Sequence, residues 1–358
     1  MRQALEIGRR GLGRTSPNPP VGAVVVRNGR VVGTGWHRRA GLPHAEVLAL
    51  EAAGPASRGA TLYLTLEPCS HHGRTPPCAP RLITAGIRRV VVGAIDPNPR
   101  VRGRGIRQLR AAGIEVVLGV EGESARELIR YFAHSIRRGL PFVRLKLAAS
   151  ADGRIATRDG RSRWITGAAA RRLVHRWRDE LDAVMVGSGT VLADDPRLTC
   201  RRPRGRDPLR VIVDSHLATP PAAAILHAGR SPVVIATTRA HEPHRARALA
   251  AQGAEILVLP ARGGRVALDA LFRALGKRGI VSLMVEGGAT LGAALIQGRH
   301  VDEIAWFTAP LLIGGDGLPM LGPLGVRSLA RAPRLVAHTT CRVGDDLLHL
   351  AAPRRARR

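Results

Sequence analysis

The first 140 residues alternate between helical and strand-like patterns of hydrophobic and polar positions. Residues 1–13 predict a helix that the Ser16-Pro17-Asn18-Pro19-Pro20 block must end, because proline cannot continue a helix. The apolar runs 21–26 and 31–35 predict two strands. Between them, Asn28-Gly29 is a dipeptide typical of a tight hairpin turn.

Helices and strands continue to alternate along the rest of the chain, and strands separated by helices predict layered α/β sheets. The block Arg137-Arg138-Gly139-Leu140-Pro141 interrupts this pattern, so we expect domains at 1–139 and 140–353 and a basic tail at 354–358. In the first domain we expect helices at 44–53 and 125–136 and strands at 61–65, 88–94 and 115–119. In the second we expect strands at 142–148, 183–186, 209–213, 233–236, 256–259 and 281–285.

The length and composition agree with two globular domains. A chain of 358 residues exceeds the roughly 250–300 residues at which a single core stops growing, and its hydrophobic content is 45%. No apolar run approaches the roughly 18 residues of a membrane helix, and the N-terminus lacks the apolar segment of a secretion signal. We therefore expect a cytoplasmic protein without a membrane partner, in which the four cysteines are reduced.

The formal net charge of +29 raises the possibility of a nucleic-acid partner, since basic surfaces bind phosphates. The distribution argues against it. Only two of the 56 basic residues are lysines, Lys146 and Lys277, and the arginines are scattered through every segment. We therefore expect no nucleic-acid partner and treat the arginines of the tail as a solvated end.

Four residues of the first domain form a candidate zinc site, with His44, Cys69 and Cys78 as ligands and Glu46 beside them. Three protein ligands leave a fourth position for water, whose pKa zinc lowers to about 7. Glu46 would take a proton from this water and deliver protons to a ring nitrogen and to departing ammonia. The four residues therefore predict a zinc deaminase.

The spacing of the two cysteines differs from the usual Cys-x-x-Cys of zinc deaminases, because eight residues separate Cys69 from Cys78. Within this insertion, His71 and His72 are alternative ligands. A further alternative is that His44 is a surface histidine and that the two cysteines are buried and inert.

Helix N-termini are expected to support the zinc site, because their positive dipole ends favour thiolate over thiol. We expect His44 and Glu46 at the start of one helix and Pro68-Cys69 at the start of another.

The second domain lacks the usual dinucleotide fingerprint, since no Gly-x-Gly-x-x-Gly follows its first strand. Its best phosphate cradle is the segment 285–292, Val-Glu-Gly-Gly-Ala-Thr-Leu-Gly, where a strand meets a glycine turn that opens a helix. Backbone amides and the helix dipole could receive a pyrophosphate there, although an ordinary tight turn has the same sequence pattern.

Two motifs of the first domain resemble one family. Residues 67–78, Glu-Pro-Cys-Ser-His-His-Gly-Arg-Thr-Pro-Pro-Cys, are similar to the zinc loop of the bifunctional riboflavin-biosynthesis deaminase-reductases. Residues 15–24, Thr-Ser-Pro-Asn-Pro-Pro-Val-Gly-Ala-Val, resemble the opening of the same family. The resemblance implies a cytidine-deaminase-like α/β/α layered N-terminal domain.

Three segments of the second half are similar to the reductase domain of that family: 146–154 continuing into 162–166, 187–199, and 285–292. The resemblance implies a dihydrofolate-reductase-like α/β fold. It also implies contacts with NADPH from Ala148, Trp164, Thr190, Asp194, Ser215, Gly288, Ala289, Thr290, Leu291, Gly292, Ala293 and Ala294, and contacts with substrate from Ser162, Arg178, Leu198, Arg201 and Glu286.

Some of these roles make physical sense. Arg178 and Arg201 have the forked donors that suit a ribose phosphate, although arginine is common throughout this chain. Core packing is the alternative role for Trp164. Beyond the strand 233–236, Thr237, Thr238 and Arg239 are candidates to bind the 2′-phosphate of NADPH, or are a plain strand-ending turn.

The resemblance implies two successive steps of riboflavin biosynthesis. Zinc-dependent deamination of 2,5-diamino-6-(5-phosphoribosylamino)pyrimidin-4(3H)-one is followed by NADPH-dependent reduction of the ribosyl side chain to ribityl. The partners are then small phosphoribosylaminopyrimidines, and a homo-oligomer is expected. The rival hypotheses are a nucleic-acid- or nucleotide-directed zinc deaminase with an accessory domain, and a non-catalytic zinc-stabilised binding protein.

Overall fold

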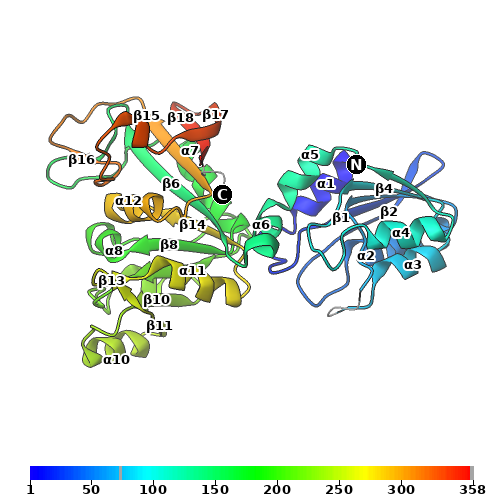
Figure 1. Cartoon of the computed structure of the whole chain (residues 1–358), viewed down its shortest axis with the longest axis horizontal. Helices are drawn as coiled ribbons and strands as arrows, with labels where there is room; N and C mark the ends of the chain where they lie inside the picture. The colour runs from blue at the N-terminus through cyan, green and yellow to red at the C-terminus, as the bar shows by residue number, and fades with distance from the viewer. Residues whose placement is uncertain (72–74, 355–358) are drawn as a thin grey trace. The chain divides into compact units, whose positions relative to one another are not determined.

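The computed structural model describes residues 1–71 and 75–354, and it divides the chain into two compact units between Leu140 and Pro141. Each unit is an α/β structure built around its own sheet, as the alternating pattern predicts (Figure 1). No helix in the described part of the chain is long and apolar enough to cross a membrane.

The first unit contains a five-stranded sheet in the order β2-β1-β3-β4-β5. Its strands are β1 (Gly22–Arg27), β2 (Arg30–Trp36), β3 (Thr61–Leu66), β4 (Arg89–Ala94) and β5 (Glu115–Leu118). The predicted hairpin is confirmed: β1 and β2 pair antiparallel, and Asn28 and Gly29 have φ angles of 50° and 74°, as a tight hairpin turn requires. The β3, β4 and β5 strands run parallel.

Helices cover both faces of this sheet (Figure 1). One face carries α1 (Arg2–Arg9) and α5 (Gly122–Leu128), and the other carries α2 (Ala45–Ala53), the short η1 (Gly54–Ser57), α3 (Cys78–Thr84) and α4 (Arg104–Ala111). The α2 backbone lies directly on β2, since Cβ atoms at Gly33 and Gly35 would come within 2.2 Å of carbonyl oxygens of α2. This close approach fixes the start of α2, where the first candidate site begins.

Two expected helix boundaries in this unit are wrong. The helix expected at 1–13 ends at Arg9, and the helix expected at 125–136 is two helices, α5 and α6 (Arg130–Arg138). Between them, Ile129 leaves helical geometry with φ −99° and ψ 11° and is buried in the core. No proline or glycine marks this break in the sequence, so the pattern alone could not locate it.

The second unit contains a nine-stranded sheet in the order β11-β10-β9-β8-β14-β6-β15-β18-β17. The strands are parallel from β11 to β15, while β18 and β17 add antiparallel strands at one edge. They are β6 (Phe142–Ser150), β8 (Ala183–Gly187), β9 (Leu209–Val213), β10 (Val233–Thr237), β11 (Ala254–Val258), β14 (Ser282–Glu286), β15 (Glu303–Ala309), β17 (Leu335–Val343) and β18 (Asp346–Pro353).

The six strands expected in the second unit are confirmed, but β15, β17 and β18 of this sheet were not foreseen. Most β17 side chains are exposed and several are polar, so this strand lacks the apolar run that marks a buried parallel strand. Two further short pairs were also missed: β7 (Arg154–Ala156) with β16 (Leu318–Pro319), and β12 (Ala261–Arg262) with β13 (Arg265–Val266).

Helices connect the strands of the second unit. They are α7 (Ala168–Glu180), α8 (Ser188–Asp194), α9 (Ala224–His227), α10 (Pro243–Ala251), α11 (Leu268–Lys277), α12 (Ala289–Gln297) and the short η2 (Leu329–Arg331). Neighbouring β6, β14 and β8 are parallel, so their carboxyl ends lie at one edge of the sheet. The second candidate site forms at this edge, where open α/β sheets usually bind ligands.

Candidate active sites

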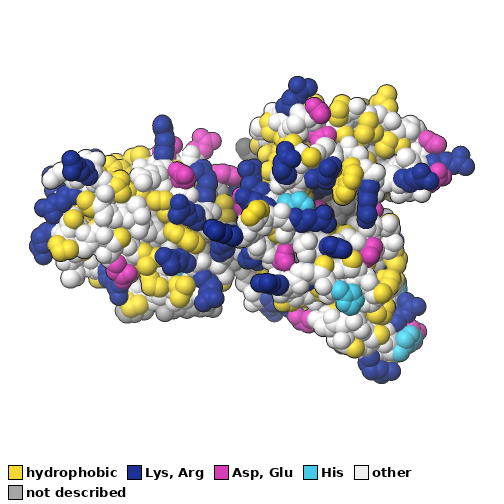
Figure 2. Space-filling view, turned by 180° about the vertical axis from the view of Figure 1, so that it is seen from behind, with side chains coloured by type: hydrophobic (Ala, Val, Ile, Leu, Met, Phe, Trp, Pro, Cys, Tyr) yellow, Lys and Arg dark blue, Asp and Glu magenta, His cyan; other side chains and the backbone are white. Residues whose placement is uncertain are grey.

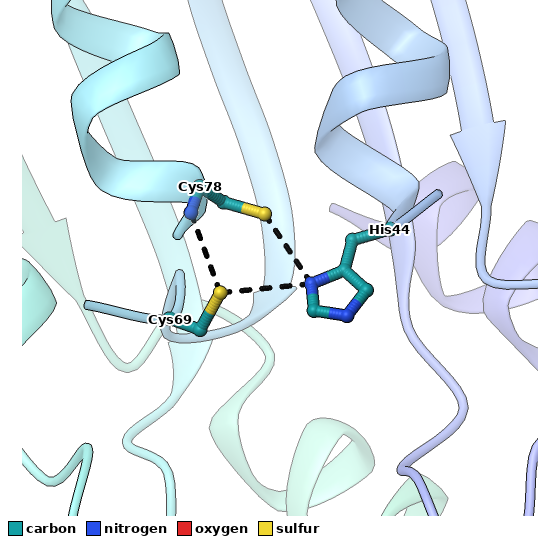
Figure 3. Close-up of side chains that lie close together, drawn as sticks. All are labelled: His44, Cys69 and Cys78. Carbon is teal, nitrogen blue, oxygen red and sulfur yellow. Dashed lines mark hydrogen bonds between the residues drawn. The ribbon is translucent and has the colours of Figure 1, made fainter. Parts of the chain in front are cut away.

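His44, Cys69 and Cys78 converge in the first unit (Figure 3). The Nδ1 atom of His44 lies 3.6 Å from Sγ of Cys69 and 3.3 Å from Sγ of Cys78. Tetrahedral zinc, with bonds of about 2.1 Å to nitrogen and 2.3 Å to sulfur, would separate the imidazole nitrogen from each sulfur by roughly 3.6 Å. One imidazole and two thiols at these separations therefore fit a zinc ion with one open coordination position.

The three candidate ligands come from two helix starts and one loop. His44 is the N-cap of α2, and Cys78 is the first residue of α3. The expectation that Cys69 opens a helix is wrong, because it lies in the loop after β3. Its carbonyl oxygen and its Sγ both accept hydrogen bonds from the first backbone amides of α3, so Cys69 caps the helix that Cys78 begins.

The electrostatics of this cluster favour a thiolate. A hydrogen bond from the Cys78 thiol, reinforced by His44, lowers the pKa of Cys69 to about 4. The same hydrogen bond and burial raise the pKa of Cys78. Interaction with Cys69 raises the pKa of His44 against the opposing effect of burial.

Glu46 lies in the first turn of α2 and is buried, with 4% of its surface exposed. Burial raises the pKa of its carboxyl group, which suits a group that accepts and returns a proton near neutral pH. Glu46 lines the same cavity of about 320 Å³ as His44 and Cys69. The cluster thus combines a metal-ligating set with a separate proton-transfer group.

The alternative ligands in the insertion have different outcomes. His71 lines the cavity but is not part of the metal-ligating cluster found among the described residues. His72 lies outside the described residues.

The structure adds residues near the zinc cluster that the motif did not single out. Thr75 Oγ1 lies 3.2 Å from Nε2 of His44, so the hydroxyl can accept that N–H while Nδ1 faces the thiols. Such partners orient metal-ligating histidines. His37 packs edge-on against His44, and Asn18 lies 3.1 Å from Nε2 of His37. Spacing alone could not identify these contacts.

A larger cavity of about 850 Å³ lies in the second unit. All five expected substrate residues line it: Ser162, Arg178, Leu198, Arg201 and Glu286. Five of the expected cofactor residues also line it: Ala148, Trp164, Thr190, Asp194 and Gly288. The other expected cofactor residues are not in this lining: Ser215, Ala289, Thr290, Leu291, Gly292, Ala293 and Ala294.

The Arg178 and Glu286 side chains form a buried ion pair in this cavity. Two parallel bonds join them, Nε to Oε1 at 2.6 Å and Nη2 to Oε2 at 2.9 Å, and their side chains are 12% and 10% exposed. Burial alone would raise the pKa of Glu286, but the Arg178 charge outweighs it and lowers that pKa. Lys146, which was not among the expected site residues, also lines the cavity, and burial lowers its pKa.

The segment between β7 and α7 is fastened to the cavity wall. Ser162 Oγ donates to Asp194 Oδ1 at 2.9 Å, and the Arg163 guanidinium donates to the Asp194 carbonyl. Trp164 is 65% exposed and carries the Arg171 guanidinium 4.5 Å from its ring centroid. Core packing is therefore the wrong alternative for Trp164, whose indole is presented to the cavity.

The expectation that Thr237 and Thr238 bind a 2′-phosphate is wrong. Both residues are buried, and both hydroxyls donate to the carbonyl oxygen of Ser215, at 3.2 and 2.9 Å. Only Arg239 of this group is exposed. The turn uses the threonine hydroxyls to satisfy its own backbone, which strand periodicity does not reveal.

Positive charge dominates the lining of the larger cavity, which suits a phosphorylated ligand. Seven cationic side chains line it (Lys146, Arg163, Arg171, Arg172, Arg178, Arg197 and Arg201) against three acidic ones (Asp194, Asp195 and Glu286). On the outer surface, Lys and Arg side chains are instead scattered over the visible face of each unit and do not gather into one stripe (Figure 2).

Comparisons with known proteins cover both units. Residues 1–94 match the cytidine and deoxycytidylate deaminase zinc-binding region, and residues 141–349 match the RibD C-terminal domain. Riboflavin biosynthesis protein RibD of Bacillus amyloliquefaciens is 42% identical over 99% of this chain and 95% of its own length.

Two solved structures agree with this result. Acinetobacter baumannii RibD (form 1) superposes with a TM-score of 0.87 at 39% identity, covering 99% of this chain and 98% of that one. The diaminohydroxyphosphoribosylaminopyrimidine deaminase/5-amino-6-(5-phosphoribosylamino)uracil reductase of Thermotoga maritima has a TM-score of 0.87 at 37% identity, covering 99% and 97%.

Proposed function

This chain belongs to the RibD family of bifunctional deaminase-reductases and carries out the deaminase and reductase steps of riboflavin biosynthesis, and we propose which residues perform each step. The rival hypothesis of a nucleic-acid-directed deaminase with an accessory domain does not account for the match of residues 141–349 to a reductase domain.

In the deaminase step, His44, Cys69 and Cys78 hold zinc, which when bound acts as a Lewis acid that makes water nucleophilic near neutral pH. Glu46 accepts a proton from the attacking water and returns protons to the ring nitrogen and to the departing amine at C2. The substrate is 2,5-diamino-6-(5-phosphoribosylamino)pyrimidin-4(3H)-one. The convergence of the three ligands beside a separate buried carboxylate is the observation that carries this proposal.

In the reductase step, NADPH when bound would supply the hydride for C1′ of 5-amino-6-(5-phosphoribosylamino)uracil, whose reduction gives the ribityl product. Arg178 and Arg201 bind the 5-phosphate, supported by the excess of cations in the cavity lining. Glu286 holds the Arg178 guanidinium in place through its two bonds. Ala148, Trp164, Thr190, Asp194 and Gly288 contact the cofactor.

Hydride addition at C1′ with opening of the ribose ring leaves the ring oxygen in need of a proton. We propose Lys146 as the donor, because this residue lines the cavity and burial lowers the pKa of its ammonium, which makes it a stronger acid. This role complements the binding role of Arg178, whose guanidinium does not release protons.

We expect the chain to act as a homo-oligomer. This expectation is supported by β17, which lies at one edge of the nine-stranded sheet. Most of its nine residues are exposed, so this edge is open to pairing with a strand of a second copy. Sedimentation equilibrium of the purified chain would test this expectation, and a monomer at micromolar concentration would contradict it.

Two measurements on the purified chain test the proposed reactions. We expect one zinc per chain with ammonia release from the diaminopyrimidine, and NADPH oxidation when the deaminated pyrimidine is supplied. A folded, zinc-loaded protein that releases no ammonia would overturn the deaminase assignment, and one that leaves NADPH unoxidised would overturn the cofactor assignment. A fragment beginning at Gly139 should retain the reductase reaction without zinc, because residues of the second unit line its cavity.

A further inference from the structure

Glu67 is a buried carboxylate that none of the roles above uses. It follows β3 directly, stands two residues before Cys69, and is only 3% exposed. Its two oxygens accept four backbone N–H groups from one segment, residues 96–106. Oε2 accepts from Asp96 at 3.2 Å and Gly103 at 2.9 Å, while Oε1 accepts from Gly105 at 3.1 Å and Ile106 at 3.5 Å.

The segment that Glu67 holds forms one wall of the deaminase cavity. Asp96, Asn98 and Val101 line that cavity, as Glu67 itself does, and residues 96–103 belong to no regular strand or helix. Within the segment, the Asn98 amide donates to Asp96 Oδ1 at 2.8 Å. Burial raises the pKa of Asp96 to about 6. Bonds within the segment shape its turns, and the four bonds to Glu67 tie the segment to the end of β3.

The start of α4 is packed against the peptide that follows Glu67. A Cβ atom at Gly105 would lie 2.0 Å from the Pro68 carbonyl oxygen, so no larger residue fits between them. Cys69 comes next in the chain. Glu67 and Gly105 together thus set the distance between the segment that carries a zinc ligand and the wall that carries Asp96 and Asn98.

We propose that Glu67 is a positioning residue of the deaminase, which holds the Asp96–Asn98 wall at the distance from the zinc ligands that the pyrimidine requires. The inference rests on the proposed deaminase function of this cavity. A misplaced wall weakens the hold on the substrate while His44, Cys69, Cys78 and Glu46 keep their places.

The alternative is that Glu67 only caps α4. The amides of Gly105 and Ile106, whose hydrogen bonds it accepts, belong to the second and third residues of that helix. A cap that acts only on stability would change the unfolding midpoint without changing the affinity of the folded enzyme for its substrate. A contact that supports only the metal loop would change zinc content. The three roles are therefore separable by measurement.

The test is Glu67→Gln in the full chain. Glutamine has the same shape, but its NH₂ group would face two backbone N–H donors in place of an acceptor oxygen. We expect one zinc per chain, unchanged reductase activity, kcat for deamination within about threefold, and KM for the diaminopyrimidine raised roughly tenfold or more. Glu115→Gln is the matched control, because that carboxylate is exposed on β5 and pairs with Arg89 outside the cavity lining.

Glu67→Asp provides a second variant if the glutamine form does not fold. It keeps the charge and both acceptor oxygens but withdraws them by one methylene, so KM should again rise at constant zinc content. An unchanged KM in a folded, zinc-loaded variant overturns the proposal, and so does a loss of activity that follows loss of zinc. Wild type and Glu115→Gln report separately on the proposed function, because both must release ammonia if the cavity is a deaminase site.

Discussion

The two candidate sites are built on different principles. In the first unit, a cavity of about 320 Å³ has its reactive groups in two short motifs, and each group has a distinct chemical identity. In the second unit, a cavity of about 850 Å³ is lined by residues from Lys146 to Met320, with seven cations among them. The first site depends on which atoms are present, and the second depends on shape and shared charge.

This difference determines how each site should respond to substitution. Removing a metal ligand or a proton-transfer group removes a function that no neighbour can supply. In the larger cavity, neighbouring guanidinium groups partly replace one that is lost, except where a charge is buried and paired. Substitution of a metal ligand or of Glu46 should therefore have a larger effect than any single substitution in the second unit.

The largest effect is expected for Glu46→Gln, which removes the proton acceptor but none of the three candidate ligands. Deamination should fall by about 10²–10⁴-fold, while zinc content and reduction of the deaminated pyrimidine stay unchanged. Ammonia release and NADPH oxidation measured on the same preparation give both values. Glu51→Gln, on the exposed side of the same helix, is the matched control. Full deaminase activity in the Glu46 variant would remove the proposed role of that residue.

A smaller but still large effect is expected for Arg178→Gln, which leaves the Glu286 carboxylate buried without its partner. Loss of a charged hydrogen bond is worth about 1.5–3 kcal/mol, so KM for the deaminated pyrimidine should rise by roughly 10- to 100-fold. The dissociation constant of NADPH should change much less. Arg176→Gln is the control, because Arg176 lies on the same helix and is 55% exposed. Equal effects of the two substitutions would show that the buried pair has no special role.

Thr75→Val tests whether the first site needs more than its three ligands. Without the hydroxyl, the Nε2–H of His44 loses its acceptor, and zinc affinity should fall about tenfold, near the low end for such partners. Thr75→Ser keeps the hydroxyl and should bind zinc as the wild type does. Competition with a chelator measures both affinities, and identical values for valine and serine would contradict the proposed contact.

The smallest effect is expected for Arg239→Ala. With Thr237 and Thr238 committed to the Ser215 carbonyl, only an exposed guanidinium remains to meet a 2′-phosphate. An exposed charge pair contributes about 0.2–1 kcal/mol, so NADPH should weaken at most two- to fivefold and NADH not at all. Dissociation constants for both cofactors decide this, and an equal loss for the two would show that Arg239 does not recognise the 2′-phosphate.

The sequence predicted more of the structure of the first unit than of the second. The Asn28-Gly29 turn and the zinc motif each rely on residues whose chemistry allows few alternatives. In the second unit, the buried parallel strands were found from their apolar runs, but β15, β17 and β18 were not. Antiparallel strands at an exposed edge carry no continuous apolar run, so their pairing depends on neighbours far away in the sequence.

By itself, the sequence determined two α/β domains and the identities of the candidate zinc ligands and of Glu46, because these follow from residue type and local spacing. The expected residues that line the larger cavity came from the resemblance to a family. Only the tertiary structure decided which side chains remain free to act. In the folded chain, Arg178 pairs with Glu286, which is 108 positions away in the sequence, and the Thr75 hydroxyl lies against His44. Glu67 accepts four backbone N–H groups from residues far from it in the sequence. Such hydrogen bonds require that two groups lie close together in space, but the two residues can be any distance apart in the sequence. A local sequence pattern therefore cannot predict them.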